Sequence, residues 1–137
     1  MLQAAKYFIA APQHFAYYLH LDDPKVVRAM RYRFKNKSII YGFRCHITRM
    51  MYIGSTLTPG LRFSEHLITG HHSNEALQEA MQVHGLSNFT GYVFKIVDVP
   101  KHLTTNQARA YLSKIEQTYL DKFPEEQLYN VIKSSKD

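Results

Sequence analysis

Three residues of this 137-residue chain carry side chains suited to chemistry on a phosphate group: Arg62, His66 and Glu116. An arginine side chain is always cationic and donates a planar pair of hydrogen bonds, which matches a phosphate. Glu116 lies between Leu112 and Leu120 at the edge of an apolar helical stripe, where a partly buried carboxylate needs a partner. Mg²⁺ prefers oxygen ligands, so one carboxylate can hold it when a phosphate supplies another ligand. Side chains of these types could bind a phosphate group and a divalent cation.

Each of these residues also has an ordinary structural explanation, which the sequence leaves open. Arg62 and His66 lie four residues apart on an expected helix and therefore point the same way, so they could form a plain exposed pair. Glu116 could be a glutamate at the rim of the core, bonded to a lysine or an arginine.

Carboxylates are scarce in the middle of the chain. Between residues 38 and 97 they are Glu65, Glu75 and Glu79, whose helical spacing predicts surface positions. No Asp-x-Glu or Asp-x-Asp pair occurs there. An enzyme that uses two metal ions normally needs a cluster of acids, so the sequence favours a site for at most one ion, Mg²⁺ or Mn²⁺.

Cys45 is the only cysteine, which excludes an internal disulfide framework and a zinc site built from several cysteines. The adjacent His71 and His72 lack the four-residue spacing of a zinc-binding helix. We therefore expect neither zinc nor redox chemistry.

The elements that must position these side chains follow from hydrophobic periodicity and from turn signals. Residues 38–46 and 49–54 are short aromatic and β-branched runs that predict a β-hairpin. Residues 89–97 predict a third strand, and the apolar run 128–132 can return to the sheet. Alternation in the third strand puts Thr90, Tyr92, Phe94 and Ile96 on one side, and Val93 and Val97 on the other.

Helix signals mark four segments. These run from Asp23 towards Phe34, from Thr58 to Gly70, from Ser73 or Asn74 to Gly85, and from Thr104 to Pro124. The last begins with a capping box of Thr104 and Gln107 and carries the stripe Ala108, Tyr111, Leu112, Ile115, Tyr119 and Phe123. Strands joined by a hairpin, followed by helices, predict an α+β fold with a small, mainly antiparallel central sheet.

Positive charge is concentrated near the N-terminus. The chain carries 17 Lys and Arg against 11 Asp and Glu, or +6, and residues 1–37 account for +5 of it. Such an excess suits an anionic partner such as nucleic acid. On the first expected helix one face is basic and another is apolar, and the basic face could contact DNA or simply be solvated. The basic residues are Lys25, Arg28, Arg31 and Lys35, and the apolar ones are Val27, Met30 and Phe34.

Composition narrows the class of protein further. A hydrophobic content of 45% with eighteen Tyr and Phe excludes a disordered tail. The longest uncharged stretch near the N-terminus, residues 7–21, is too short and too polar to span a bilayer, and Lys6 with the run after it falls short of a signal peptide. We expect a soluble, intracellular protein without a membrane partner.

In chain order, these pieces form a pattern: Ile39-Ile40-Tyr41, Tyr52-Ile53-Gly54-Ser55, Arg62, His66, His72, Glu116 and Asn130. The pattern resembles the catalytic domain of the GIY-YIG nuclease family, most closely the homing endonucleases encoded within introns. The resemblance covers residues 38–132 and extends to Ser73-Asn74 with Leu77-Gln78, and to the run from His84 to Phe89. One departure is Ile39, which stands where the family has glycine.

The resemblance implies a sheet of about three strands flanked by helices, and it implies roles for the two tyrosines. Tyr41 would be the general base or would position the water, assisted by Tyr52. A free phenol is a poor base at neutral pH, so a nearby cation or a metal-bound water must lower its pKa. His66 would orient Tyr41 or relay its proton.

The remaining residues of the pattern would bind the substrate and the metal ion. Arg62 would bind the scissile phosphate, with His72 as a weaker contact to DNA, and Glu116 would hold the metal ion. Asn130 would tie a C-terminal strand to the site.

The expected function is therefore a metal-dependent endonuclease acting on double-stranded DNA by a one-metal mechanism. The expected organisation is a basic helical extension (1–37), a catalytic domain (38–132) and a tail (133–137). Sequence-specific recognition would need an additional DNA-recognition domain or subunit. An intron-encoded eukaryotic protein of this kind would act in a mitochondrion or a nucleus. The alternative, motivated by Ile39, is a catalytically degenerate nuclease fold that binds nucleic acid or a protein.

Overall fold

The structure is a computed structural model and describes residues 8–131. The strands in this range are β1 (Ala16–Tyr18), β2 (Ser38–Cys45), β3 (Met51–Thr56) and β4 (Phe89–Val97). They form one antiparallel sheet in the order β1-β4-β2-β3. β2 is therefore a central strand, and β3 lies at the edge.

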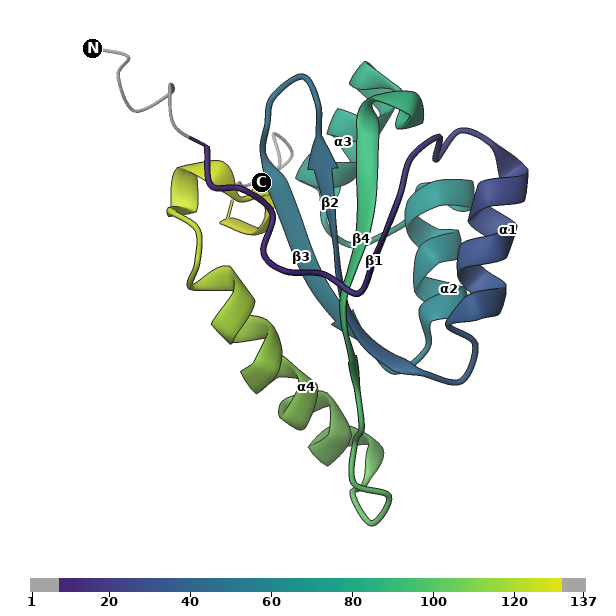
Figure 1. The fold of residues 1–137 in the computed structure, drawn as a ribbon, viewed down its shortest axis with the longest axis vertical. Helices are drawn as coiled ribbons and strands as arrows, with labels where there is room; N and C mark the ends of the chain where they lie inside the picture. The colour runs from purple at the N-terminus through teal and green to yellow at the C-terminus, as the bar shows by residue number, and fades with distance from the viewer. Residues whose placement is uncertain (1–7, 132–137) are drawn as a thin grey trace.

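The helices cover both faces of this sheet. They are α1 (Pro24–Arg33), α2 (Pro59–Ser64), α3 (Glu75–His84) and α4 (Thr105–Leu120). A π-helix, Glu65–Thr69, continues α2 directly, and 3₁₀ helices cover Leu86–Asn88, Glu125–Gln127 and Tyr129–Val131. In Figure 1, α4 lies to the left of the sheet, and α1 and α2 lie to the right. The expected α+β fold with an antiparallel sheet between helices is confirmed, with four strands where about three were expected.

Side-chain caps explain where the helices begin. Asp23 and Asn74 each accept a backbone N–H of the first turn of α1 and α3, respectively. Thr104 and Gln107 form the predicted reciprocal capping box of α4. Thr58 precedes α2 as predicted, but its side chain makes no capping bond.

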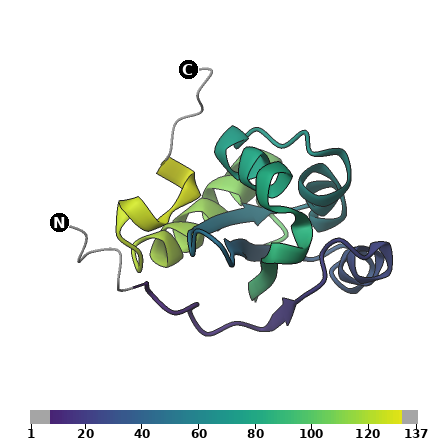
Figure 2. The ribbon, with the colours of Figure 1, turned by 90° about the horizontal axis from the view of Figure 1, so that it is seen from above.

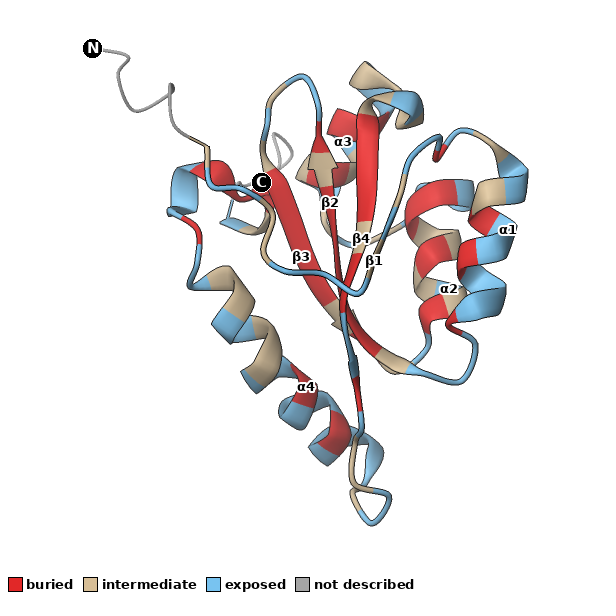
Figure 3. Ribbon diagram, in the orientation of Figure 1, coloured by how far each residue is buried: buried red, intermediate tan, exposed pale blue. Residues whose placement is uncertain are grey.

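Much of the length of the strands is buried (Figure 3), and apolar side chains pack in one cluster on each face of the sheet. On one face Ile39, Tyr41 and Phe43 of β2 pack against α1, α2 and α3. On the other face Ile53 packs against α4. Cys45 ends β2 as a free, fully buried thiol. The apolar residues of α1 join the first face as predicted, and they are Val27, Met30 and Phe34.

A β-bulge in β4 changes the side on which its last residues point. The ladder between β2 and β4 passes over Phe94, which is an extra residue. Phe94 and Val97 consequently pack in one cluster, beside α4, whereas Val93 packs on the opposite face. The predicted alternation, which put Phe94 with Ile96 and Val97 with Val93, is therefore wrong beyond the bulge.

The predicted return of residues 128–132 to the sheet as a strand is also wrong for the described part of that run. Leu128 forms one isolated bridge with β3, and Tyr129–Val131 is a 3₁₀ helix. The physical reason lies in Asn130, whose side chain bonds both backbone groups of Ile53. The Asn130 side chain thus forms the hydrogen bonds at the edge of β3 that a further strand was expected to form.

The N-terminal part of the chain contributes a strand that sequence patterns did not predict. β1 pairs with β4, and the backbone N–H of Phe15 donates to the carbonyl of Val93. Before β1 the chain is extended along the outside of the molecule (Figure 2), and the backbone N–H of Ile9 donates to Oε1 of Gln127. β1 and α1 therefore share one sheet and one core with the rest of the protein.

The expected division into residues 1–37, 38–132 and 133–137 stays a prediction. The structure shows no break in packing at Lys37, since α1 belongs to the same core as β2. Residues 1–7 and 132–137 lie outside the described residues. Across residues 8–131, no helix is both long enough and apolar enough to cross a membrane.

Candidate active site

The β2–β3 hairpin brings two tyrosines and a glycine together. Tyr41 pairs with Gly54 across the hairpin, and Tyr52 lies two residues before Gly54 on the same side of the sheet. A methyl group at Gly54 would come within 2.7 Å of the Tyr41 ring and hydroxyl. The rings of Tyr41 and Tyr52 lie 6.1 Å apart. The phenol of Tyr41 can therefore lie here only because residue 54 has no side chain.

Tyr41 and His66 form a buried hydrogen-bonded pair. The Tyr41 hydroxyl lies 2.8 Å from Nε2 of His66, and the two residues are only 1% and 2% exposed. The other ring nitrogen of His66, Nδ1, lies 2.8 Å from Oε1 of Gln78 in α3. The structure thus brings Tyr41 and His66 together and adds Gln78, which lies in the resemblance but was not predicted as a site residue.

Burial shifts the pKa of these rings. It raises the pKa of Tyr41 well above its ordinary value, and the neighbouring Tyr52 raises it further. It raises the pKa of Tyr52 to about 12. It lowers the pKa of His66 to about 3, because a buried imidazolium loses its hydration, and His72 beside it lowers the value further. At neutral pH both phenols are protonated and His66 is neutral in the free protein.

Glu116 lies on the other face of β3. Ser55 Oγ donates a hydrogen bond of 2.6 Å to Oε1 of Glu116. Burial raises the pKa of Glu116, and the bond from Ser55 lowers it in part. In the described part of the chain no Lys, Arg or His forms an ion pair with Glu116. The alternative of a rim glutamate paired with a basic residue is therefore not what the structure shows.

A hollow of about 540 Å³ opens at this edge of the sheet, between β3, α2 and α4. Its lining includes Ser55, Arg62, Arg109 and Glu116. Arg109 precedes Glu116 by seven residues, so both lie on one side of α4. The sequence analysis did not consider Arg109, although this spacing was a signal that could have identified it.

Arg62 forms an ion pair at the edge of this hollow. Its Nη1 lies 2.6 Å from Oε1 of Glu65, and the two side chains are 33% and 29% exposed. This contact uses one of the five N–H donors of the guanidinium, so the others can reach a phosphate.

The charges of Arg62 and Glu116 act on both tyrosines. Besides the effect of burial, Arg62 lowers and Glu116 raises the pKa of both Tyr41 and Tyr52. The four side chains come from β2, β3, α2 and α4. Arg62 and Glu116 border the hollow at the β3 edge, whereas Tyr41 and Tyr52 lie on the opposite face of the hairpin from Glu116.

The π-helix explains why Arg62 and His66 differ in their surroundings. The single helix predicted from Thr58 to Gly70 changes from α to π after Ser64. Backbone bonds that span five residues displace the faces that α-helical spacing predicts. As a result His66 is buried against Tyr41, whereas Arg62 borders the hollow.

His72 packs beside His66. Its ring stacks on that of His66 with centroids 3.9 Å apart, and its Nδ1 accepts the backbone N–H of Asn74. Burial lowers the pKa of His72 to about 4, and Arg62 lowers it further. His72 is therefore neutral at pH 7, and its Nε2–H can donate a hydrogen bond but supplies no charge.

Asn130 ties the C-terminal segment to the site. Its Oδ1 accepts the backbone N–H of Ile53 over 3.0 Å, and its Nδ2 donates to the Ile53 carbonyl over 2.7 Å. Ile53 directly precedes Gly54, so Asn130 supports the backbone beside Tyr41 without contacting its hydroxyl.

The basic residues of the first predicted helix are all exposed: Lys25, Arg28 and Arg31 lie on α1, and Lys35 lies in the turn after α1 ends at Arg33. Nε of Arg31 donates to the carbonyl of Gly60 at the start of α2. α1 therefore lies against the helix that carries Arg62.

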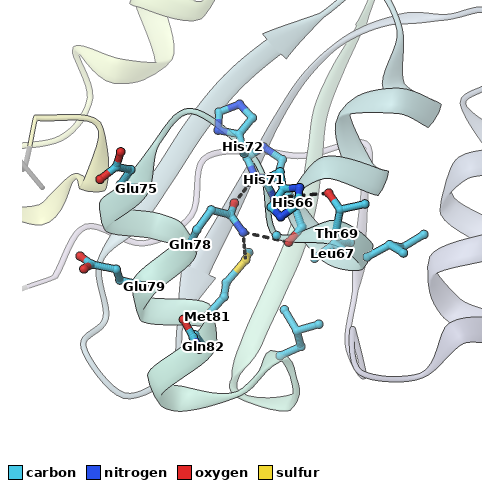
Figure 4. Close-up of a pocket in the computed structure, with 13 residues that line it drawn as sticks. His66, Leu67, Thr69, His71, His72, Glu75, Gln78, Glu79, Met81 and Gln82 are labelled. Carbon is cyan, nitrogen blue, oxygen red and sulfur yellow. Dashed lines mark hydrogen bonds between the residues drawn. The ribbon is translucent and has the colours of Figure 1, made fainter. Parts of the chain in front are cut away.

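A second hollow, of about 680 Å³, borders His66 and is lined by the π-helix, the loop after it and α3 (Figure 4). Gln78 points from α3 towards His66, whereas Glu75 and Glu79 point away (Figure 4). Among residues 8–131 no group of three or more His, Cys, Asp or Glu is arranged to hold a metal ion.

Glu116 fits a hard divalent cation as a single ligand. Its carboxylate is partly buried, and burial without a cationic partner is costly for the charged form. Mg²⁺ or Mn²⁺ would offset that cost, with water and a phosphate supplying the other ligands.

No protein-family model matches the chain, and no curated protein or solved structure is significantly similar to it. The functional conclusion below therefore rests on the sequence pattern and on the geometry of the site.

Proposed function

We propose that this protein is a GIY-YIG-type endonuclease that hydrolyses phosphodiester bonds of double-stranded DNA with one Mg²⁺ or Mn²⁺ ion. The observation that carries the proposal is that Arg62 and Glu116 line one hollow beside the β2–β3 hairpin, which holds Tyr41 against His66. Hydrolysis needs a group that takes a proton from water and cations that stabilise the charge on the phosphate. The site contains candidates for each role.

Tyr41 acts on the attacking water, with His66 as its hydrogen-bond partner. Because burial raises the pKa of Tyr41, its phenol is a base only once its own proton has moved towards His66. The negative charge of a bound phosphate raises the pKa of a nearby imidazole, which favours this movement when DNA is bound.

Arg62 and Arg109 bind phosphate groups from two sides of the hollow. Both guanidinium groups line it, and each donates a planar set of hydrogen bonds. Arg62 stabilises the charge on the scissile phosphate, while Arg109, on α4, contacts the same phosphate or the next one along the strand.

Glu116 holds the metal ion, and Ser55 fixes the orientation of its carboxylate. When bound there, Mg²⁺ supplies a Lewis acid that stabilises negative charge as the phosphodiester bond breaks. The exposed basic face of α1 adds contacts to the DNA backbone that do not depend on base sequence.

Cleavage of supercoiled plasmid in the presence of Mg²⁺ tests the proposal. Wild type should nick or linearise the plasmid, whereas Glu116→Gln and Arg62→Ala should lose about 100-fold or more of the rate. Lys114→Ala is the control, because this exposed residue of α4 does not line the hollow. Equal cleavage by Glu116→Gln and wild type would show that the roles are assigned wrongly.

A second candidate function is a degenerate nuclease fold that binds nucleic acid without cutting it. The observation that favours it is the burial of Tyr41, which is only 1% exposed. Ile39 is less informative, because it is buried in the core and pairs with Thr56 in the intact hairpin. Plasmid binding by the wild type, with no cleavage under Mg²⁺ or Mn²⁺, would favour this second function.

A further inference from the structure

His66 is held by hydrogen bonds to two elements besides its own. Its Nε2 lies 2.8 Å from the hydroxyl oxygen of Tyr41 in β2, and its Nδ1 lies 2.8 Å from Oε1 of Gln78 in α3. Gln78 makes a second bond, because its Nε2 donates over 3.1 Å to the backbone carbonyl of His66. One glutamine side chain thus binds both the ring and the backbone of the same histidine.

These bonds are compatible with only one arrangement of protons. A backbone carbonyl only accepts hydrogen bonds, so the amide nitrogen of Gln78 must face it and the amide oxygen must face Nδ1. The amide oxygen is also only an acceptor, so Nδ1 of His66 carries the proton. A neutral imidazole has one N–H, which leaves Nε2 bare to accept the hydroxyl proton of Tyr41.

The other neighbours of the His66 ring do not determine which of its nitrogens carries the proton. In the described part of the chain His72, Tyr52 and Phe43 contact the imidazole through their rings, with centroids 3.9, 5.4 and 5.0 Å away. None of these contacts is a hydrogen bond to Nδ1. Gln78 is therefore the residue that decides which nitrogen of His66 is protonated.

We propose that Gln78 is a positioning residue that selects the His66 tautomer able to receive the proton of Tyr41. In the opposite tautomer Nε2–H would donate to the phenol oxygen, and Tyr41 could not pass its proton to His66. The catalytic part of this inference rests on the proposed function, whereas the tautomer is a property of the free protein.

The ring nitrogen resonances of His66 in ¹⁵N-labelled protein test the tautomer without DNA or metal. Wild type should show a single neutral form at pH 7 with the proton on Nδ1, assigned by its loss in His66→Gln. Gln78→Met has similar length and removes both hydrogen bonds, so the form with the proton on Nε2 should become populated. Gln78→Glu keeps an acceptor opposite Nδ1 and should preserve the wild-type form.

Gln82→Met is the matched control. Gln82 lies one turn further along α3 and lines the same hollow beside His66, but it is exposed. The resonances of His66 should be unchanged in this variant, and thermal unfolding of all variants should show one cooperative transition.

Plasmid cleavage then tests the catalytic part. Gln78→Met should lower kcat by about 10- to 100-fold with little change in KM, while Gln78→Glu should retain most of the activity and Gln82→Met all of it. A purely structural role would lower the melting temperature of both Gln78 variants and would not be rescued by glutamate.

The two measurements separate the possible failures. A wild-type proton on Nε2, or an unchanged tautomer in Gln78→Met, would overturn the role of Gln78 whatever the protein cleaves. The expected tautomers together with wild-type protein that does not cleave would overturn the proposed function and leave the selection of the tautomer intact. Full cleavage by a Gln78→Met protein with the altered tautomer would overturn the catalytic part alone.

Discussion

Gly54 determines how closely β3 approaches Tyr41, and it allows a direct test of that packing. We expect Gly54→Ala to lower the free energy of unfolding by about 1 to 3 kcal/mol, because the methyl group would collide with the phenol. Gly60→Ala is the matched control, since an added methyl there meets no atom within 4 Å. The control should leave stability unchanged or raise it by up to about 1 kcal/mol. Urea denaturation measures both, and equal effects would contradict the packing role of Gly54.

His66 makes stability depend on pH. Burial lowers its pKa from 6.5 to about 3, so between these values the unfolded chain binds a proton that the folded protein does not. The stability that this residue contributes is complete above pH 6.5 and is lost as the pH falls towards 3. From pH 7 to 4.5 the unfolding free energy of wild type should fall by about 2 to 3 kcal/mol more than that of His66→Gln. Urea titrations at both values measure this, and an equal fall would contradict the burial of a neutral imidazole.

Single residues differed in how far the sequence could identify them. Tyr41, Arg62, His66 and Glu116 were predicted as site residues because their types and order form a pattern in the chain. Gln78 was not found, because a glutamine on a helix acquires a role only through the side chain that faces it across the fold. Spacing alone also could not show that Tyr41 is fully buried, since burial depends on the helices that cover the sheet.

Among the elements, the C-terminal segment depends on one side chain for its contact with β3. Asn130→Ala would leave two backbone groups of Ile53 without their partner, so the unfolding free energy should fall by about 1 to 3 kcal/mol. Hydrogen exchange at the Ile53 amide should become faster. Asn106→Ala, at an exposed position in the first turn of α4, is the control and should leave that exchange rate unchanged. Unchanged exchange in Asn130→Ala would show that the contact is not stabilising.

The elements themselves were largely predictable where local signals were strong. The hairpin, the strand over residues 89–97 and the four helices follow from periodicity and caps, which act within a few residues. The bulge at Phe94 and the pairing of β1 were missed, because both depend on a partner strand far away in the chain. The change from α to π after Ser64 likewise has no local signal in the sequence.

For the molecule as a whole, the concentration of charge near the N-terminus can be tested without disturbing the core. Deletion of residues 1–37 would remove β1 and α1, which pack in the core, so substitutions on the exposed face of α1 are the sharper test. Replacement of Lys25 and Arg28 on α1, and of Lys35 just after it, by glutamine should reduce the slope of log Kd for DNA against log salt by about 2 to 3, because each phosphate contact releases counterions.

A variant with the same net charge provides the comparison for this experiment. Lys101, Lys114 and Lys122 are also exposed but lie on or beside α4. Their replacement by glutamine should leave the slope close to that of wild type. An equal reduction in both variants would mean that only net charge matters and that α1 makes no particular contact with DNA.

Because Cys45 is buried, its reactivity can be used to measure how often the folded protein opens. The thiol is the only one in the chain and is fully buried at the end of a central strand. A thiol-specific reagent can react with it only in molecules whose sheet has separated from the helices, so the labelling rate measures how often that happens. Addition of DNA with Mg²⁺ should slow the labelling if both bind the folded form, and this readout requires no cleavage.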